Sequence, residues 1–283
     1  MKPAPIHRSQ VIGSPWPGIF GTHIDSARHY GRHTHSTYGF GLLADGAQRS
    51  ASGRGQVDAF AGDVISTNPG EVHDGQPLDG PSRRWRMLYL EADAFASLME
   101  GAQGHIEITR PVMHDPQLAA ALVRLLDRLD CWHISSHGAK PAHDAHALAC
   151  EESLVEACGL LRNRHTGAAP MREVAAELRG VRERLADDLL HAPTLAELAA
   201  MAGLSRFQLL RRFEKQHGVP PHAWLLQQRA ECAQGLIRSG MDLAGAAASS
   251  GFADQSHMTR IFVRQFGFTP GAWRAATGGG RLQ

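Results

Sequence analysis

The sequence predicts an α+β protein of two domains: an antiparallel β domain that continues into helices, and an all-α domain at the carboxyl end. Up to about residue 90, short alternating or apolar runs are punctuated by glycine, which is typical of strands and turns. After residue 116 the apolar period becomes helical, and the last ninety residues contain one small unit twice. We expect domains at residues 1–165 and 171–283, because residues 165–170 have the composition of a linker.

Composition excludes several classes of protein. The chain has 283 residues, of which 43% are apolar and 20% charged, and its formal net charge is +1, which suits a globular chain rather than a disordered or polybasic one. No apolar stretch reaches the roughly 18 residues that span a bilayer, and residues 1–10 lack the apolar core of a signal peptide. We therefore expect a cytoplasmic protein with no membrane partner. The four cysteines form no C-x-x-C pair and are expected to be buried, reduced thiols.

Five strands are predicted in the first ninety residues. They are bounded by turn signals such as Asp45-Gly46, Ala61-Gly62 and Asn68-Pro69-Gly70, and this spacing favours a small antiparallel barrel or sandwich. The predicted strands are Ile19–Ile24, Tyr38–Leu43, Gln56–Phe60, Asp63–Thr67 and Trp85–Leu90.

Two helices are predicted after the strands. A leucine stripe from Leu118 to Leu129 indicates the first helix, and the second is expected from about Pro141 to Arg164. Their apolar stripes suit either packing against the β domain or pairing of two subunits.

The carboxyl-terminal repeat is the strongest pattern in the sequence. A shift of 48 positions, which becomes 49 after a one-residue insertion, aligns the first unit with the second. The aligned pairs include Gly203 with Gly251, Phe213 with Phe262, Gly218 with Gly267, Pro221 with Pro270, and Trp224 with Trp273.

Each repeated unit is predicted to fold as helix, tight turn, helix. In the first unit, Thr194 with Glu197 and Ser205 with Gln208 have the spacing of capping boxes, so a helix should begin at each pair. Glycine supplies the backbone conformation of the turn between them. In the second unit, Asp242 and Asp254 precede the two helices, Gly251 lies between them, and the same fold is expected.

Helices joined by such a turn are typical of the helix-turn-helix, whose second helix enters the major groove of DNA. A hairpin repeat used only for packing is the alternative, but such repeats generally need at least three units. From residue 204 onward, 10 basic residues face 4 acidic ones, which favours a polyanion partner, although a solvated basic face has the same balance. The candidate DNA-binding residues are Arg206, Phe207, Arg211 and Arg212 in the first unit, and Gln255, Ser256, Thr259, Arg260 and Arg264 in the second.

The segment between the units is predicted to be one helix, from Pro221 to Ser239. At 1.5 Å per residue it spans roughly 28 Å, close to the roughly 34 Å of one DNA turn. We therefore expect one chain to present two recognition helices to successive major grooves of a non-palindromic site.

The residues from Leu195 through Trp224, then Gly251-Phe252, Phe262 and Gly267-Phe268-Thr269-Pro270, resemble the DNA-binding domain of the AraC/XylS transcription regulators. The resemblance implies base contacts from Phe207, Leu210 and Arg211 in the first unit and from Gln255, Ser256 and Arg260 in the second. Leu210 can meet only an apolar feature such as a thymine methyl, so specificity in the first unit should depend largely on Arg211.

The amino-terminal half resembles cupin barrels in two motifs, His33-Thr34-His35 and the run from Gly62-Asp63 to His73. The resemblance implies a cupin-like antiparallel β-barrel that senses a small-molecule effector. The candidate effector-binding residues are His33, His35, Tyr38, His73 and Trp85.

Three imidazoles could also form a metal site. Metal-binding cupins normally add a carboxylate a few residues after the first histidine pair, but residues 36–43 contain no Asp or Glu. We therefore expect no bound metal or other cofactor, and read the histidines as hydrogen-bonding groups of a ligand pocket or as polar residues at a barrel mouth.

Together these patterns predict a sequence-specific transcription regulator, not an enzyme, that is controlled by a small-molecule effector and acts as a homodimer on promoter DNA. RNA polymerase is a further candidate partner. The alternatives are a metal-dependent cupin enzyme fused to a DNA-binding tail, against which the missing carboxylate argues, and a DNA-repair alkyl acceptor. The latter needs an activated cysteine, and no cysteine here has a recognisable proton acceptor nearby in the sequence.

Overall fold

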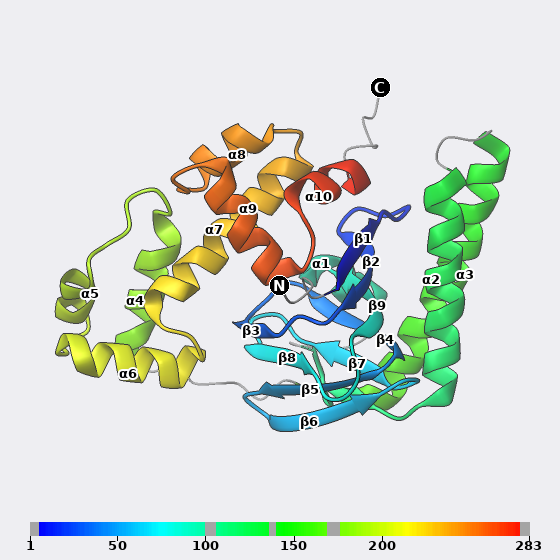
Figure 1. The fold of residues 1–283 in the computed structure, drawn as a ribbon, viewed down its shortest axis with the longest axis horizontal. Helices are drawn as coiled ribbons and strands as arrows, with labels where there is room; N and C mark the ends of the chain where they lie inside the picture. The colour runs from blue at the N-terminus through cyan, green and yellow to red at the C-terminus, as the bar shows by residue number, and fades with distance from the viewer. Residues whose placement is uncertain (1–5, 100–105, 136–139, 169–175, 278–283) are drawn as a thin grey trace. The chain divides into compact units, whose positions relative to one another are not determined.

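The computed structural model describes residues 6–99, 106–135, 140–168 and 176–277 (Figure 1). The chain divides into two compact units, residues 1–30 with 35–169 and residues 170–283 with 31–34. Residues 31–33 nevertheless belong to a strand that is hydrogen-bonded within the amino-terminal β domain.

The amino-terminal unit is built on two main sheets. Neighbouring strands are antiparallel throughout the six-stranded sheet and, in the four-stranded sheet, between β5 and its neighbours β6 and β8. The six-stranded sheet has the order β1-β2-β9-β4-β7-β11, and the four-stranded sheet has the order β3-β8-β5-β6. The strands of the first sheet are β1 His7–Ile12, β2 Ile19–Ser26, β9 Arg83–Leu90, β4 Tyr38–Asp45, β7 Val64–Thr67 and β11 Val112–Met113. Those of the second are β3 Tyr30–His33, β8 His73–Pro77, β5 Ala47–Ser52 and β6 Gly55–Phe60.

Strand β9 shows how the six-stranded sheet separates two cores. Its side chains alternate between the faces of the sheet, as strand geometry requires. Trp85 and Met87 belong to a core shared with Tyr30 of β3 and Ala59 of β6, so this core lies between the two sheets. Leu88 and Leu90 belong to the second core, which continues into the helices of the unit. Both faces of the central strands are therefore buried.

Three helices follow or interrupt the strands of this unit: α1 Ala92–Leu98, α2 Pro116–Ser135 and α3 Lys140–His165. Helices α2 and α3 lie side by side (Figure 1), and the predicted leucine stripe of α2 is fully buried. Part of the expected linker is a strand instead, because β12 Thr166–Ala168 pairs with β10 Ile106–Ile108. The linker prediction was wrong for these three residues, since backbone pairing there outweighs their loop-like composition.

The carboxyl-terminal unit is helical. Its helices are α4 Ala176–Asp187, α5 Leu195–Met201, α6 Arg206–His217, α7 Pro221–Arg238, α8 Leu243–Ser249, α9 Gln255–Phe266 and α10 Pro270–Thr277. The long helix α7 runs between the two repeated units and packs against helices of both (Figure 1). Helix α4, which no sequence pattern predicted, contributes Leu178, Val181 and Leu185 to the core of the first unit.

The predicted fold class is confirmed: an antiparallel β domain followed by helices precedes a helical domain with two helix-turn-helix units. Within the described residues, the strands are hydrogen-bonded as two main sheets rather than as one continuous barrel. All five predicted strands are present. Strands β1, β3, β5 and β8 were missed because polar residues interrupt their alternation, and β10, β11 and β12 because they are only two or three residues long. No described helix combines the length and the apolar character that crossing a bilayer requires.

Candidate functional site

The first helix-turn-helix is formed by α5 and α6. Both predicted capping boxes are present: the Thr194 hydroxyl accepts a hydrogen bond from the Glu197 backbone N–H, and Ser205 accepts one from Gln208. In each box the side chain three residues later bonds back to the N-cap backbone, so two unsatisfied donors at the helix start are satisfied together. Helix α6 ends at Gly218, whose φ of 73° is left-handed. The helix boundaries are therefore set locally.

The second helix-turn-helix, α8 and α9, uses aspartate caps. Asp242 and Asp254 each accept a backbone N–H three residues ahead, at 2.7 Å in both cases. Gly251 lies between the helices at a φ of 79°. Leu209 and Phe213 of α6 and Met258 and Phe262 of α9, which the repeat aligns, are all buried. The repeat in sequence is thus a repeat in structure.

The ten candidate DNA-binding residues all lie on α6 and α9. Leu210 and Thr259 are half-buried, and the other eight are exposed. Phe207 has 66% of its surface exposed, which is high for an aromatic side chain. The Arg211 guanidinium carbon lies 5.7 Å from the centre of the Phe207 ring, so one turn of α6 presents an apolar and a cationic group together.

Thr259 is the one candidate whose hydroxyl is already used. Its Oγ1 donates to the Gln255 carbonyl at 2.8 Å, a bond to the preceding turn of its own helix. The side chain therefore offers its methyl group outward more readily than its hydroxyl.

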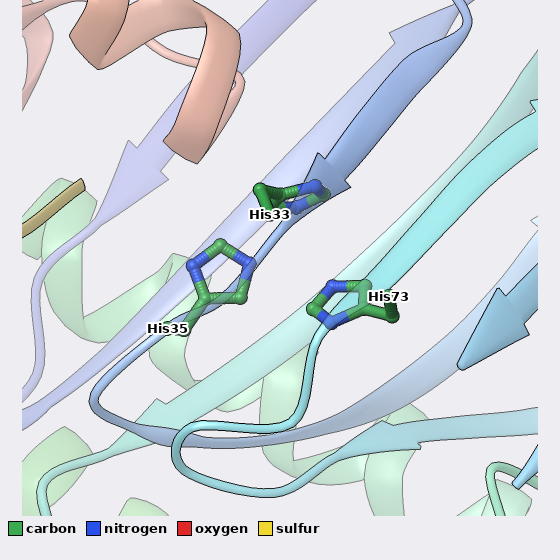
Figure 2. Close-up of side chains that lie close together, drawn as sticks. All are labelled: His33, His35 and His73. Atoms are coloured by element: carbon green, nitrogen blue, oxygen red, sulfur yellow. The ribbon is translucent and has the colours of Figure 1, made fainter. Parts of the chain in front are cut away.

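Three of the five candidate effector-binding residues converge in the β domain. One ring nitrogen from each of His33, His35 and His73 lies within 4.8 Å of the others (Figure 2). His33 ends β3, His35 follows in the next loop, and His73 begins β8, which neighbours β3 in the four-stranded sheet. His33 and His35 are each 8% exposed, and the rings of His35 and His73 have centroids 5.2 Å apart.

Two of these imidazoles are held by backbone carbonyls. Nδ1 of His33 lies 2.7 Å from the Gly31 carbonyl oxygen, and Nδ1 of His73 lies 2.9 Å from that of Glu71. Because a carbonyl only accepts, each Nδ1 carries the proton and donates, and Nε2 is the basic nitrogen of the neutral ring. Burial lowers the pKa of His73 below the usual value for imidazole, which favours that neutral form.

Tyr89 of β9 lies beside this cluster, although it is not among the candidate effector-binding residues. Its ring centroid lies 5.9 Å from that of His35, and burial raises the pKa of its hydroxyl. Gly39 of β4 makes room for the ring, since a Cβ there would lie 2.9 Å from Tyr89 Cε1. The alternation of β9, which places Tyr89 on the face of Trp85 and Met87, was the available signal.

The structure does not bring Tyr38 to the histidines. Tyr38 stacks on Phe95 of α1 with ring centroids 3.9 Å apart, and its hydroxyl donates to the Ile106 carbonyl at 2.7 Å. It belongs to the core shared with the helices, on the other face of the six-stranded sheet from the histidines. Trp85 shares the inner core but makes ring contacts with Tyr30 and Arg83.

Arg83 is a functional candidate that no pattern in the sequence singles out. It is 1% exposed, and its guanidinium carbon lies 4.8 Å from the centre of the Trp85 ring. It donates to the Gln48 side chain and to the backbone carbonyls of Ser26 and Arg28, and no described carboxylate pairs with it. Burial lowers its pKa to about 10.

Two exposed recognition helices, joined in one chain to an antiparallel β domain with converging buried polar groups, define a DNA-binding regulator with a separate ligand-binding domain. Family comparison agrees at both ends. Residues 17–158 match the AraC-like ligand binding domain, and residues 198–276 match a helix-turn-helix domain. The chain belongs to the AraC family of transcriptional regulators, so the predicted resemblance and function class are confirmed.

Individual relatives are similar along most of the chain. The uncharacterized HTH-type transcriptional regulator YbfI of Bacillus subtilis is 28% identical over 248 residues, which cover 83% of this chain and 86% of that protein. The MmsAB operon regulatory protein of Pseudomonas aeruginosa is 26% identical over 218 residues, or 76% of this chain and 66% of that protein.

A solved structure shares the whole architecture. ToxT from Vibrio cholerae, crystallised with an unsaturated fatty acid bound, covers 98% of this chain and 98% of its own, with a TM-score of 0.50 and 12% identity. An apo crystal structure of a ToxT variant covers 93% of this chain and 99% of its own, with a TM-score of 0.51 and 13% identity. At this identity the likeness shows the fold alone.

Proposed function

We propose that this AraC-family regulator reads a promoter through α6 and α9 and that a small molecule held in the β domain controls the reading. The observation that carries the proposal is the pair of recognition helices, each with a polar, exposed outer face and a buried inner one.

Residues of both helices are assigned either to base edges or to the phosphate backbone. Arg211 and Arg260 are assigned to base edges, because arginine binds guanine with two parallel hydrogen bonds. Arg212 and Arg264 are assigned to phosphates, Arg206 to a base edge in the first groove, and Gln255 and Ser256 to base edges in the second. Phe207, Leu210 and the Thr259 methyl supply apolar contacts of the kind that thymine methyls accept.

The effector site is assigned to the interior of the β domain, at His33, His35 and His73 with Tyr89 beside them and Trp85 on the same face of β9. Control of DNA binding requires that the effector bind more tightly to one arrangement of the chain than to another, since equal affinities would shift nothing. The fusion of such a site to a DNA-binding unit supports this linkage.

We further propose that the functional species is a homodimer formed through α3. Leu148 and Val155, seven residues apart on this helix, are 60% and 59% exposed, which leaves an apolar stripe available to a second copy. A regulator that reads promoter DNA acts where the chromosome is, so we place it in the cytoplasm, with RNA polymerase as a further partner. No catalytic role is assigned, because the relatives are named as regulators.

Footprinting of the full-length chain on DNA from upstream of its own gene tests this proposal. Protection should fall in two successive major grooves on one face, their centres about 10 base pairs apart. Arg211→Ala should weaken protection mainly in one groove and Arg260→Ala mainly in the other. Protection of a single groove by the unaltered chain would contradict the assignment.

A further inference from the structure

The geometry points to a metal site: we propose that His33, His35 and His73 together bind one divalent transition-metal ion, of which Zn²⁺ is the best match. The site lies within the proposed effector pocket, so the regulatory meaning of the ion rests on the proposed function, whereas its binding does not. The sequence argued against a metal because the usual carboxylate ligand is missing. That carboxylate would be a fourth protein ligand, and three imidazoles can bind an ion without it.

The first argument is convergence. Nitrogens from three imidazoles, supplied by β3, the following loop and β8, lie within 4.8 Å of one another (Figure 2). Two nitrogens bound to one zinc ion at about 2.1 Å are at most about 4.2 Å apart, and about 3.4 Å apart in a tetrahedral arrangement. Nitrogens at the 4.8 Å limit therefore have to close by about 0.6 to 1.4 Å when the ion binds.

The second argument is orientation of the rings. A metal-bound histidine almost always donates its other ring N–H to a carbonyl or carboxylate, which fixes the tautomer. His33 and His73 already do so, at 2.7 Å to the Gly31 carbonyl and 2.9 Å to the Glu71 carbonyl. Both carbonyls come from two residues earlier in the chain, so the local backbone sets each ring with Nε2 as its ligand atom.

The ligand set selects the kind of ion. Neutral imidazoles suit Zn²⁺, Cu²⁺, Ni²⁺ or Fe²⁺ rather than Mg²⁺ or Ca²⁺, which need oxygen ligands. Asp74 and Glu71 are the carboxylates next to His73 in sequence, and both are engaged elsewhere. Asp74 Oδ1 accepts the Ala51 backbone N–H at 2.7 Å, and the oxygens of Glu71 lie 3.4 Å from Arg54 Nε and 3.1 Å from Asn68 Nδ2. Within the described residues no Cys, Asp or Glu joins the three histidines, which leaves the fourth position of a tetrahedral zinc ion to water or to an effector atom.

The inference is tested by direct measurement of bound metal on the full-length chain. After chelation and dialysis the protein is loaded with ZnCl₂, passed over a desalting column and assayed for zinc by mass spectrometry. We expect one zinc per chain, and His33→Gln and His73→Gln should each weaken zinc affinity by at least about 100-fold in a competition titration with a chromophoric chelator. His29→Gln is the matched control, because His29 is exposed and lies four residues before His33.

A second measurement needs no substitution. Co²⁺ bound by three imidazoles in tetrahedral geometry gives the unaltered chain strong visible absorption, which Zn²⁺ should displace at one equivalent. An unaltered chain that retains no zinc and gives no such absorption would overturn the inference. So would zinc that is retained equally by the unaltered chain and by folded His33→Gln and His73→Gln variants, because the ion would then lie elsewhere.

Failure of the inference and failure of the proposed function are distinguishable. The footprint is repeated with chelated and with zinc-loaded protein. If a chain that takes up no zinc still protects two grooves, the metal site is rejected and the proposed function as a regulator is retained. If a chain binds one equivalent of zinc but protects no DNA, the proposed function is rejected and the metal site is retained.

Discussion

Arg260 and Arg264 lie one turn apart on α9 and are both exposed, yet they are assigned different contacts. Arg260→Ala should cost about 1 to 3 kcal/mol at the cognate site and relax the preference at one base pair, because a base contact distinguishes sequences. Arg264→Ala should weaken binding to all sequences alike and reduce the slope of log affinity against log salt by about one. Fluorescence anisotropy on cognate and scrambled duplexes at several salt concentrations measures both effects, and matching results for the two variants would refute the division.

His217 gives the DNA-binding unit a pH dependence. Its ring centroid lies 4.3 Å from that of Phe213 at the end of α6, and burial, with the nearby Arg182 charge, lowers its pKa to about 4. The unfolded chain therefore takes up a proton near pH 6.5 that the folded chain refuses, so stability that is full above about 6.5 is lost as pH falls toward 4.

The measurement is the melting temperature of the full chain between pH 7.5 and 4.5, beside His217→Gln, which cannot titrate. The variant should show a shallower fall over this range, and the slope, not the absolute value, is the readout. His222→Gln provides a control, since His222 is an exposed histidine of the same unit. Parallel slopes for the unaltered chain and His217→Gln would show that another group controls the acid sensitivity.

Single residues also show where sequence reasoning stopped. The ten DNA-binding candidates could be placed on two helices because those helices have strong caps and a repeated apolar stripe, which are local features. Sequence patterns could not place Tyr89 beside the histidines and Tyr38 apart from them, because the face on which a strand residue lies depends on register and on what packs above it. The burial of Arg83 could not be predicted, since nothing in the neighbouring sequence distinguishes a buried arginine from an exposed one.

At the scale of elements, Gly251 lies where the second helix-turn-helix unit contacts Leu189 and Arg229. Arg229 of α7 donates from Nε to the Leu189 carbonyl ahead of the first unit, at 2.8 Å. A Cβ on Gly251, in the turn of the second unit, would lie 2.3 Å from that carbonyl oxygen and 2.9 Å from Arg229 Nε. The relative placement of the two recognition helices thus depends on a position that only glycine fits.

Gly203, the aligned glycine of the first unit, provides the matched comparison. It has a φ of 63°, but a Cβ there would meet nothing within 4 Å. Gly203→Ala should cost about 1 kcal/mol from backbone strain alone, and Gly251→Ala at least about twice as much, because the clash adds to the strain. Calorimetric unfolding of both variants measures the difference, and equal losses would mean that the contact with Leu189 and Arg229 relaxes freely.

Elements with a clear period were predicted, and elements fixed by their partners were not. Helices α5 to α9 have caps and stripes written in consecutive residues, so their bounds followed closely. Strands β3, β5 and β8 are short and polar, and they exist because the four-stranded sheet pairs them. The same holds for β12, whose residues have the composition of a linker and form a strand because they pair with β10.

At the scale of the whole molecule, the proposed dimer gives a prediction. Leu148→Glu with Val155→Glu places two charges on the exposed stripe of α3, which should convert a dimer into a monomer by desolvation cost and like-charge repulsion. Sedimentation equilibrium measures the mass of the full chain. Leu190→Glu, at a residue that is 53% exposed in the other unit, should leave the dimer intact. A double variant that sediments like the unaltered chain would exclude this face as the interface.

The sequence by itself determined the fold class, the paired helix-turn-helix units and the family, because caps, turns and helical periods are properties of neighbouring residues. Only the tertiary structure decided that His33, His35 and His73 meet, that Tyr89 rather than Tyr38 joins them, and that Arg83 is buried among aromatic rings. These facts depend on strand order and register, which bring together residues that are tens of positions apart and which no local pattern specifies.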